Sequence, residues 1–428
     1  MSPRASVLAL AAATLALAGA APVSASPRVL LVDGSSVRST PANGAELAGA
    51  DASPADAAGL LGSAARVQTT DKKKTSKKKA KKPPYDLTVI RKAINKAGGV
   101  PARAYDARAA LTSADRVMRA AKKDSQAKRE LEGLFKYVTV MARGNRITAD
   151  RMLMLTETLR RNAEWWKLGR ATGNGQRVQF DGSQMIWQLY TGSGIQLQWL
   201  GTFGRGNSLF YSGAAHVAEL SALVDEAIKL AVPRAGGISW EYFFPFGGGN
   251  PPWVSGMAEA TGIQVLARAS GPTKMNRPAL LETAKSAMGI LRTPPPTGVQ
   301  VVEDTGTHFL IYSFSAAKVL NAMNQTVNGL YAYVLANPTD VDARLTLLDG
   351  LRWLDTNVGR YDTGSWTLYQ LGGAKADTHY HGVARDFLKT LCSLLHADAK
   401  TPGGGPTGAY PSANICAAAA TWTKYSAK

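Results

Sequence analysis

Apolar residues recur along most of the chain at a spacing close to 3.6, the period of an amphipathic helix. Pro233 and the pair Asn337-Pro338 are placed where the first two of these stripes end, and Thr339 is a suitable N-cap for the third. The pattern therefore predicts helices over residues 217–231, 319–334, 345–351 and 383–395.

Loops rich in Gly, Pro and aromatic residues separate the predicted helices, over residues 240–253, 293–305 and 361–380. Helices that cannot bury their apolar faces alone pair around a common core, and their loops then gather on one rim. We therefore expect an all-α fold over residues 85–400, an α/α toroid or incomplete α/α barrel with aromatic rim loops. Because no strict repeat is found, an irregular helical solenoid stays the alternative.

The N-terminal part differs in composition from the rest. Arg4, an apolar stretch over residues 7–20 and the small residues Val23-Ser24-Ala25 predict an export signal over residues 1–25. Residues 26–84 are Ala/Ser-rich and then Lys-rich, which predicts a disordered linker. Within it, residues 29–37 could form a strand, for which the sequence shows no partner. The lysines suit either a solvated linker or electrostatic attachment to an anionic cell surface.

Export places the protein outside the cell or at the cell wall, where disulfides form. Cys392 and Cys416, the two cysteines of the chain, are expected to pair and to pin the tail over residues 401–428 to the body. No apolar run approaches the roughly 18 residues of a membrane-spanning helix. With two cysteines and five histidines, we expect no metal site, and no motif indicates a cofactor.

The formal net charge of +19 favours an anionic partner. Nucleic acid is the first candidate for such a balance, but the sequence has no zinc-finger, RNA-recognition or helix-turn-helix signature. An acidic polysaccharide suits an exported protein better, and we expect no nucleic-acid partner.

Four landmarks in order resemble the catalytic domain at the C-terminus of the D-glucuronyl C5-epimerase family. They are Trp253-Val254-Ser255-Gly256-Met257-Ala258-Glu259-Ala260, Val319-Leu320-Asn321 with Gly329-Leu330-Tyr331, Tyr361-Asp362-Thr363-Gly364-Ser365 with Tyr369-x-Leu371, and Tyr380-His381. The resemblance covers about residues 180–396. At one position it breaks, because Gly372 stands where the family has an arginine.

The resemblance implies a toroidal domain that inverts C5 of glucuronic acid residues within a polymer, with tyrosines as the groups that transfer the proton. By position, Tyr369 and Tyr380 match tyrosines of the family's motifs, and Tyr312 lies near a third, with a one-residue gap. Tyr361, Trp253, Glu259 and Asn321 belong to the same landmarks and are candidates for substrate binding.

The chemistry makes the same demands independently. A proton on the carbon that bears a carboxylate is weakly acidic, so the intermediate needs cations around that carboxylate, for which Arg360, Lys375 and Arg385 are nearby candidates. Inversion needs one base on each face of the ring. A tyrosine suits this role if neighbouring positive charge lowers its pKa. His381 could orient or deprotonate one of the tyrosines.

The leading hypothesis is therefore an exported uronyl C5-epimerase, an isomerase without a cofactor. A polysaccharide lyase would abstract the same C5 proton and then expel the C4 substituent, so the sequence cannot separate these two. A non-catalytic glycan-binding protein of the cell wall is the third interpretation.

Overall fold

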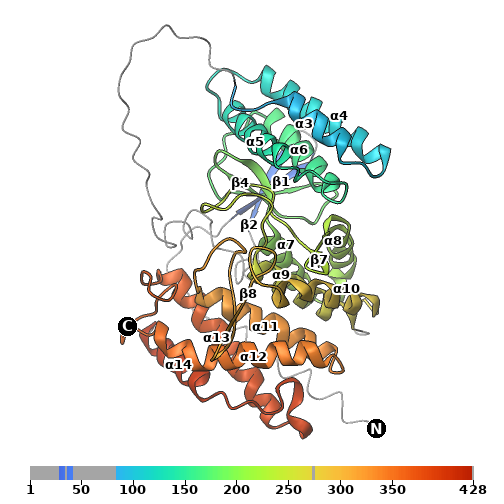
Figure 1. The fold of residues 1–428 in the computed structure, drawn as a ribbon. Helices are drawn as coiled ribbons and strands as arrows, with labels where there is room; N and C mark the ends of the chain where they lie inside the picture. The colour runs from blue at the N-terminus through green and yellow to red at the C-terminus, as the bar shows by residue number, and fades with distance from the viewer. Residues whose placement is uncertain (1–27, 34–35, 42–82, 272–274, 427–428) are drawn as a thin grey trace.

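The computed structural model describes residues 28–33, 36–41, 83–271 and 275–426, and these are mostly helical (Figure 1). The predicted helical character of the chain is thereby confirmed. The predicted export signal and the Lys-rich stretch over residues 72–82 lie outside the described residues. Within the described part, no helix is both long and apolar enough to cross a membrane.

Four helices form the first part of the described chain, drawn in blue and green in Figure 1. Asp86 begins the first of them by accepting hydrogen bonds from the backbone N–H groups of Thr88 and Val89, and Ser125 caps the third. Helix α4 packs against α6, and α3 packs against α5. Their bounds are α3 (Leu87–Lys96), α4 (Pro101–Ala120), α5 (Gln126–Arg143) and α6 (Met152–Lys167).

A five-stranded sheet follows, in the order β2-β1-β3-β4-β5. Strand β1 runs parallel to β3, and the other neighbours are antiparallel. The bounds are β1 (Arg28–Asp33), β2 (Ser36–Pro41), β3 (Arg177–Phe180), β4 (Trp187–Tyr190) and β5 (Gly194–Leu197). Residues 28–33 and 36–41 thus form strands inside the segment predicted as a disordered linker, so that prediction is wrong for them. Their partner β3 lies far along the chain, where a local pattern cannot reveal it.

Eight α-helices make up most of the remaining described chain, with α9 and α11 at their centre. Nearly all residues of these two helices are buried, including polar ones, so other elements cover them on nearly every side. They approach so closely that a Cβ atom on Gly329 would lie 2.4 Å from the carbonyl oxygen of Ala260. The bounds are α7 (Trp199–Tyr211), α8 (Val217–Leu230), α9 (Gly256–Ser270), α10 (Ala279–Ala287), α11 (Leu320–Ala336), α12 (Val341–Asn357), α13 (Thr378–Ala399) and α14 (Ala413–Tyr425).

All four helices predicted from the apolar spacing are present, as α8, α11, α12 and α13. One detail is corrected, because the residue that caps α12 is Asp340, whose carboxylate accepts from the N–H of Ala343, and not Thr339. Two short hairpins complete the fold, β6 (Val232–Arg234) with β7 (Gly237–Ser239) and β8 (Gln300–Glu303) with β9 (Gly306–Phe309).

The predicted pairing of Cys392 with Cys416 is confirmed by a disulfide between α13 and α14. The C-terminal tail also contains a helix, because α14 lies in it and packs on α13 and α12. Trp422 and Tyr425 of α14 donate hydrogen bonds to the two carboxylate oxygens of Asp362, at 2.9 and 3.0 Å. The C-terminal helix thus holds the loop that carries Tyr369.

Candidate functional site

Tyr369 is positioned by backbone pairing between its loop and the start of α11. The N–H of Leu320 donates to the carbonyl of Tyr369, and the N–H of Leu371 donates to the carbonyl of Lys318, both at 3.1 Å. Tyr380 lies in the first turn of α13, where Asp377 caps the helix by accepting from the N–H of Tyr380. The two tyrosine rings meet edge to face, with centroids 4.8 Å apart.

The hydroxyl of Tyr369 is buried and has no hydrogen-bond partner among the described residues. Such an orphaned polar group costs about 1–3 kcal/mol, so a ligand that binds it recovers that energy. Burial raises the pKa of Tyr369 well above its usual value, and the neighbouring Tyr312 and Tyr380 raise it further. The hydroxyl is therefore protonated at neutral pH and offers a hydrogen bond to a bound molecule.

Tyr312 is brought to the same region by the loop after β9. Its ring packs on those of Phe314, Trp253 and Phe246, with centroids between 5.2 and 5.4 Å away. Burial raises the pKa of Tyr312. Tyr312 also lies near enough to Tyr369 to raise its pKa, although the chain separates the two residues by α11 and α12.

Trp253 lies inside this aromatic cluster and is not a free surface for a sugar. Its indole N–H donates to the carbonyl of Phe244 at 2.7 Å, and its ring stacks on Tyr242 with centroids 4.2 Å apart. Trp253 therefore packs against Tyr312 and helps to position it, and its part in substrate binding stays a prediction.

Two of the three cations expected around the tyrosines are engaged by other side chains. Arg360 donates to the side chain of Asn357, and Arg385 forms two hydrogen bonds with its neighbour Asp386. Lys375 lies exposed on the loop before α13. The expected lowering of the tyrosine pKa by positive charge is therefore not found for Tyr369, because burial and neighbouring groups all act to raise it.

His381 points away from the tyrosines. Its Nδ1 contacts the hydroxyl of Thr367 at 3.0 Å, and its Nε2 contacts the hydroxyl of Ser426 at 3.0 Å, beyond the end of α14. Its ring stacks on Trp366, with centroids 3.8 Å apart, and burial lowers its pKa. Because both ring nitrogens are occupied, the expectation that His381 orients or deprotonates a tyrosine is wrong, and the residue fastens α14 to the loop.

Tyr361 is likewise a packing residue. It is fully buried, and its hydroxyl donates to the carbonyl of Lys318 at 2.9 Å, the same carbonyl that accepts from Leu371. Burial raises its pKa despite the nearby Arg360. Tyr361 therefore supports the loop of Tyr369 and does not reach a ligand.

Asn321 and Glu259 each keep a buried oxygen without a partner among the described residues. Asn321 follows Leu320, whose N–H binds the carbonyl of Tyr369, so the backbone of Asn321 lies at the start of α11 next to the loop of Tyr369. Glu259 accepts a hydrogen bond from the N–H of Trp240, and burial raises its pKa to about 8. Asn321 remains a candidate substrate ligand, whereas Glu259 is a neutral group of the core.

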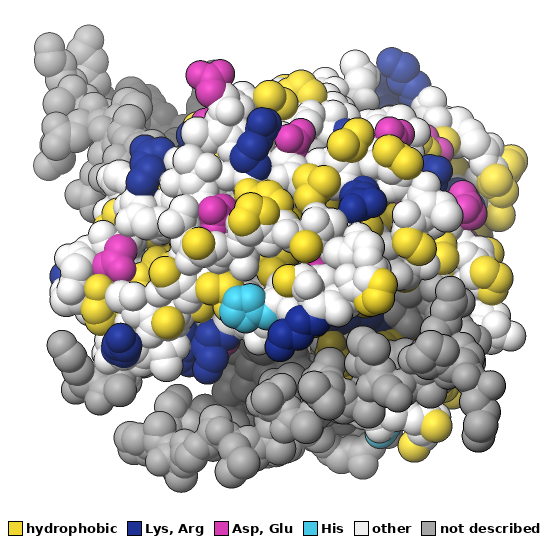
Figure 2. Space-filling model, turned by 90° about the horizontal axis from the view of Figure 1, so that it is seen from below, with side chains coloured by type: hydrophobic (Ala, Val, Ile, Leu, Met, Phe, Trp, Pro, Cys, Tyr) yellow, Lys and Arg dark blue, Asp and Glu magenta, His cyan; other side chains and the backbone are white. Residues whose placement is uncertain are grey.

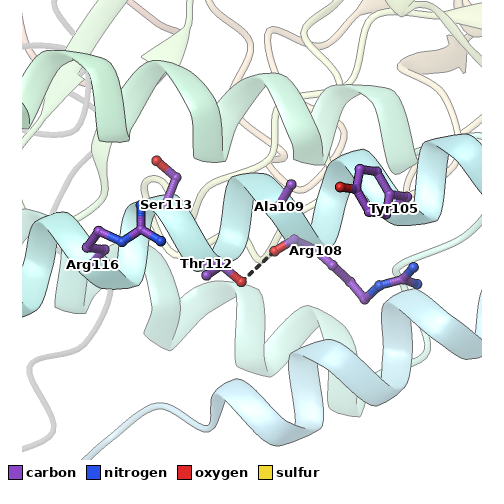
Figure 3. Close-up of a pocket in the computed structure, with 6 residues that line it drawn as sticks. All are labelled: Tyr105, Arg108, Ala109, Thr112, Ser113 and Arg116. Atoms are coloured by element: carbon purple, nitrogen blue, oxygen red, sulfur yellow. Dashed lines mark hydrogen bonds between the residues drawn. The ribbon is translucent and has the colours of Figure 1, made fainter.

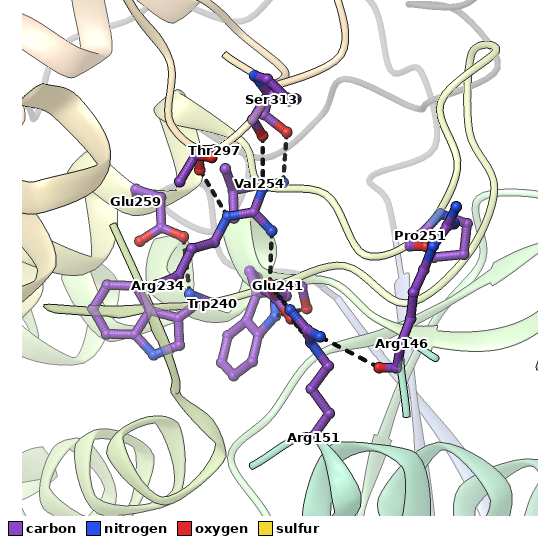
Figure 4. A network of polar contacts seen from close by, with 12 residues as sticks. Arg146, Arg151, Arg234, Trp240, Glu241, Pro251, Val254, Glu259, Thr297 and Ser313 are labelled. Carbon is purple, nitrogen blue, oxygen red and sulfur yellow. Dashed lines mark hydrogen bonds and ion pairs between the residues drawn. The ribbon is translucent and has the colours of Figure 1, made fainter. Parts of the chain in front are cut away.

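A buried ion network next to the aromatic cluster escaped the sequence analysis (Figure 4). Glu241, whose side chain is fully buried, accepts two hydrogen bonds from Arg151 at 2.6 and 2.9 Å and one from Arg234 at 2.7 Å. The next residue, Tyr242, stacks on Trp253. No local signal could have found this network, because Arg151 precedes α6 and is far from Glu241 in the chain.

One group of potential metal ligands is present in the described part of the chain, formed by Cys392, His396 and Cys416. Both sulfurs are bonded to each other, so His396 is the ligand that this group still offers. His396 is exposed on α13, and its ring nitrogens contact the sulfurs of Cys392 and Cys416.

Comparison with known families gives one match, to the D-glucuronyl C5-epimerase C-terminus over residues 236–399. This range contains Tyr312, Tyr369 and Tyr380 and confirms the resemblance seen in the sequence. A comparison with curated proteins finds none that matches the chain.

Proposed function

Because residues 236–399 match the C-terminal domain of the D-glucuronyl C5-epimerase family, we propose that this protein is an exported isomerase that inverts C5 of uronic acid residues within an acidic polysaccharide. The observation that carries the proposal is the edge-to-face contact between the buried rings of Tyr369 and Tyr380, with Tyr312 near enough to raise the pKa of Tyr369 and with the hydroxyl of Tyr369 unpartnered among the described residues.

The proposed reaction moves one proton off C5 and another onto the opposite face. An ionised tyrosine takes the C5 proton, the electron pair spreads into the adjoining carboxylate, and a protonated tyrosine then delivers a proton from the other side. The rings of Tyr369 and Tyr380 touch, so a pyranose does not fit between them. We therefore place Tyr312 on one face of the sugar and the pair Tyr369 and Tyr380 on the other.

Burial adjusts these tyrosines to a weak carbon acid. It raises the pKa of Tyr312 and Tyr369, so that their ionised forms are stronger bases than an exposed tyrosinate. The same burial keeps the tyrosine hydroxyls protonated in most of the protein molecules at neutral pH. The tyrosine that delivers the proton to C5 needs this protonated form. Turnover under this proposal depends on the small ionised fraction and rises with pH.

The remaining expectations form part of the proposal. Helices α7 to α14 form the incomplete α/α toroid, and the loops over residues 240–253, 293–305 and 361–380 form its rim. The disulfide between Cys392 and Cys416 suits an oxidising compartment outside the cell, as the predicted export signal does. The Lys-rich arm adds electrostatic attachment to an anionic surface.

The test incubates the purified protein with a panel of uronate polymers in deuterium oxide. Deuterium at C5, together with inverted residues and no rise in ultraviolet absorbance, is the expected result. A rise in absorbance signals an unsaturated product and establishes the lyase instead. Binding without deuterium uptake, unchanged when Tyr369 and Tyr380 are both replaced by Phe, establishes a glycan-binding protein.

A further inference from the structure

The outer face of α4 carries a shallow pocket of about 360 Å³ (Figure 3). The opposite face of the helix carries the buried residues Ala107, Leu111 and Ala114. The pocket therefore lies on the side of α4 that faces away from the core. The residues that line it are Tyr105, Arg108, Ala109, Thr112, Ser113 and Arg116.

The pocket combines an exposed ring with two guanidinium groups. Tyr105 is 66% exposed, so its ring is accessible to a ligand. Arg108 donates one hydrogen bond to the side chain of Asn95 at 2.8 Å, which orients its guanidinium and leaves further N–H groups for a ligand. Arg108 and Arg116 lie eight residues apart, or about 12 Å along the helix axis.

These two arginines differ from Arg119 on the same helix, which forms a hydrogen-bonded ion pair with Asp115 at 2.9 Å. Within the described part of the chain, no carboxylate lies at ion-pair distance from Arg108 or Arg116. An uncompensated pair of planar guanidinium groups is suited to binding carboxylates through paired hydrogen bonds.

The surrounding chain adds to this positive potential. Residues 87–123, which include α3 and α4, contain nine Lys and Arg residues and two Asp residues, Asp106 and Asp115. Charge of one sign gathered on a small region attracts polyanions from solution and raises their local concentration.

We propose that this face of α4 is a second binding site for the acidic polysaccharide, separate from the tyrosine cluster. The ring of Tyr105 packs against a sugar face, and Arg108 and Arg116 bind two carboxylates along the polymer. The identity of the ligand as a uronate polymer rests on the proposed function. Helix α4 and α13, which carries Tyr380, lie toward opposite ends of the molecule in Figure 1. A polymer long enough to span both sites is kept near the tyrosines by its contact with α4, whereas a short one binds at one site at a time.

The test uses a double variant in which Arg108→Gln and Arg116→Gln are combined. The matched control is a second double variant, which combines Lys136→Gln and Lys229→Gln. The control removes the same two charges from exposed positions on α5 and α8. Calorimetric titration with a long uronate polymer at low and at physiological salt measures the affinity. We expect the α4 variant to bind roughly twofold to thirtyfold more weakly than the control, the range that two exposed ion pairs give, with the larger loss at low salt.

Turnover provides a second measurement. In the α4 variant the KM for the long polymer is expected to rise, while kcat and turnover of a uronate tetrasaccharide stay as in the control. Equal affinity of the α4 variant and the control for the long polymer overturns the inference. A larger loss of affinity for single-stranded DNA than for the uronate polymer overturns the proposed ligand.

The two proposals fail in different ways. If the α4 variant loses affinity but the unaltered protein never incorporates deuterium at C5, the second site stands and the epimerase proposal falls. If deuterium is incorporated and the α4 variant binds the polymer as the control does, only the second site is wrong.

Discussion

Replacing Glu241 by Gln tests whether the ion network holds the aromatic cluster in place. The substitution keeps the size of the side chain and one acceptor oxygen, but it removes the charge that faces Arg151 and Arg234. The Glu241 side chain is fully buried, while those of Arg151 and Arg234 are 21% and 13% exposed. The two arginines would therefore remain as largely buried cations without a counterion.

Removing one partner of a buried ion pair costs about 3–5 kcal/mol. Water reaches part of both arginines, and Arg234 keeps its hydrogen bonds to the carbonyls of Pro296 and Thr297. We therefore expect a loss near the lower end, about 3 kcal/mol. Urea unfolding followed by tryptophan fluorescence measures it as a lower midpoint at an unchanged slope.

The control is Asp349→Asn, which breaks the exposed ion pair between Asp349 and Arg352, where both side chains are more than half exposed. That loss should stay below about 1 kcal/mol. The reasoning is refuted if Glu241→Gln also loses less than about 1 kcal/mol at an unchanged slope.

Four further predictions concern the tyrosine cluster and the tail. Tyr369→Phe should lower turnover at least a hundredfold, as expected for the loss of a general base or acid. The free energy of unfolding should be unchanged or higher, because the lost hydroxyl is unpartnered among the described residues. A fall in turnover that is accompanied by a fall in the free energy of unfolding would contradict this prediction. The ionised tyrosine is the base and its pKa is raised, so turnover should rise about tenfold per unit from pH 7 to 9, and a flat profile would count against tyrosine. The pKa of Glu259 is about 8 in the folded protein and about 4.5 in the unfolded chain, so unfolding releases a proton between these pH values. The free energy of unfolding should therefore fall as the pH rises from about 4.5 to about 8. Urea titrations at several pH values measure this fall, and Glu259→Gln should abolish the contribution of this group. Replacing Cys392 and Cys416 by Ser should lower the free energy of unfolding by about 3.5 kcal/mol from the loop of 24 residues, and thermal unfolding of the oxidised parent with and without a dithiol reductant provides the comparison.

Local patterns were sufficient for several features of the fold and site. Helix α8 was predictable because its apolar residues lie on one stripe and Pro233 follows it closely. The disulfide could be predicted because the chain has two cysteines and a predicted export signal. Tyr369 and Tyr380 could be selected because the family's motifs surround them over a few residues. The signals for α8 and for the two tyrosines each lie within a short stretch of chain.

The roles of single polar residues could not be predicted in the same way. His381 and Tyr361 stand beside the candidate tyrosines in the sequence, yet their hydrogen bonds go to Ser426 and to the carbonyl of Lys318. Trp253 belongs to a family landmark and is nevertheless enclosed by other rings. Adjacency in the chain does not fix the direction of a side chain, because successive residues point to different sides of their element.

The sequence by itself determined that the chain is mostly helical, that its cysteines pair, and that Tyr312, Tyr369 and Tyr380 are the residues to consider. The tertiary structure decided that β1 pairs with β3, that Glu241 is held between two arginines, and which buried oxygens stay free for a ligand. Periodicity and motifs depend on neighbours in the chain, whereas partners, burial and pKa depend on groups that meet only after folding.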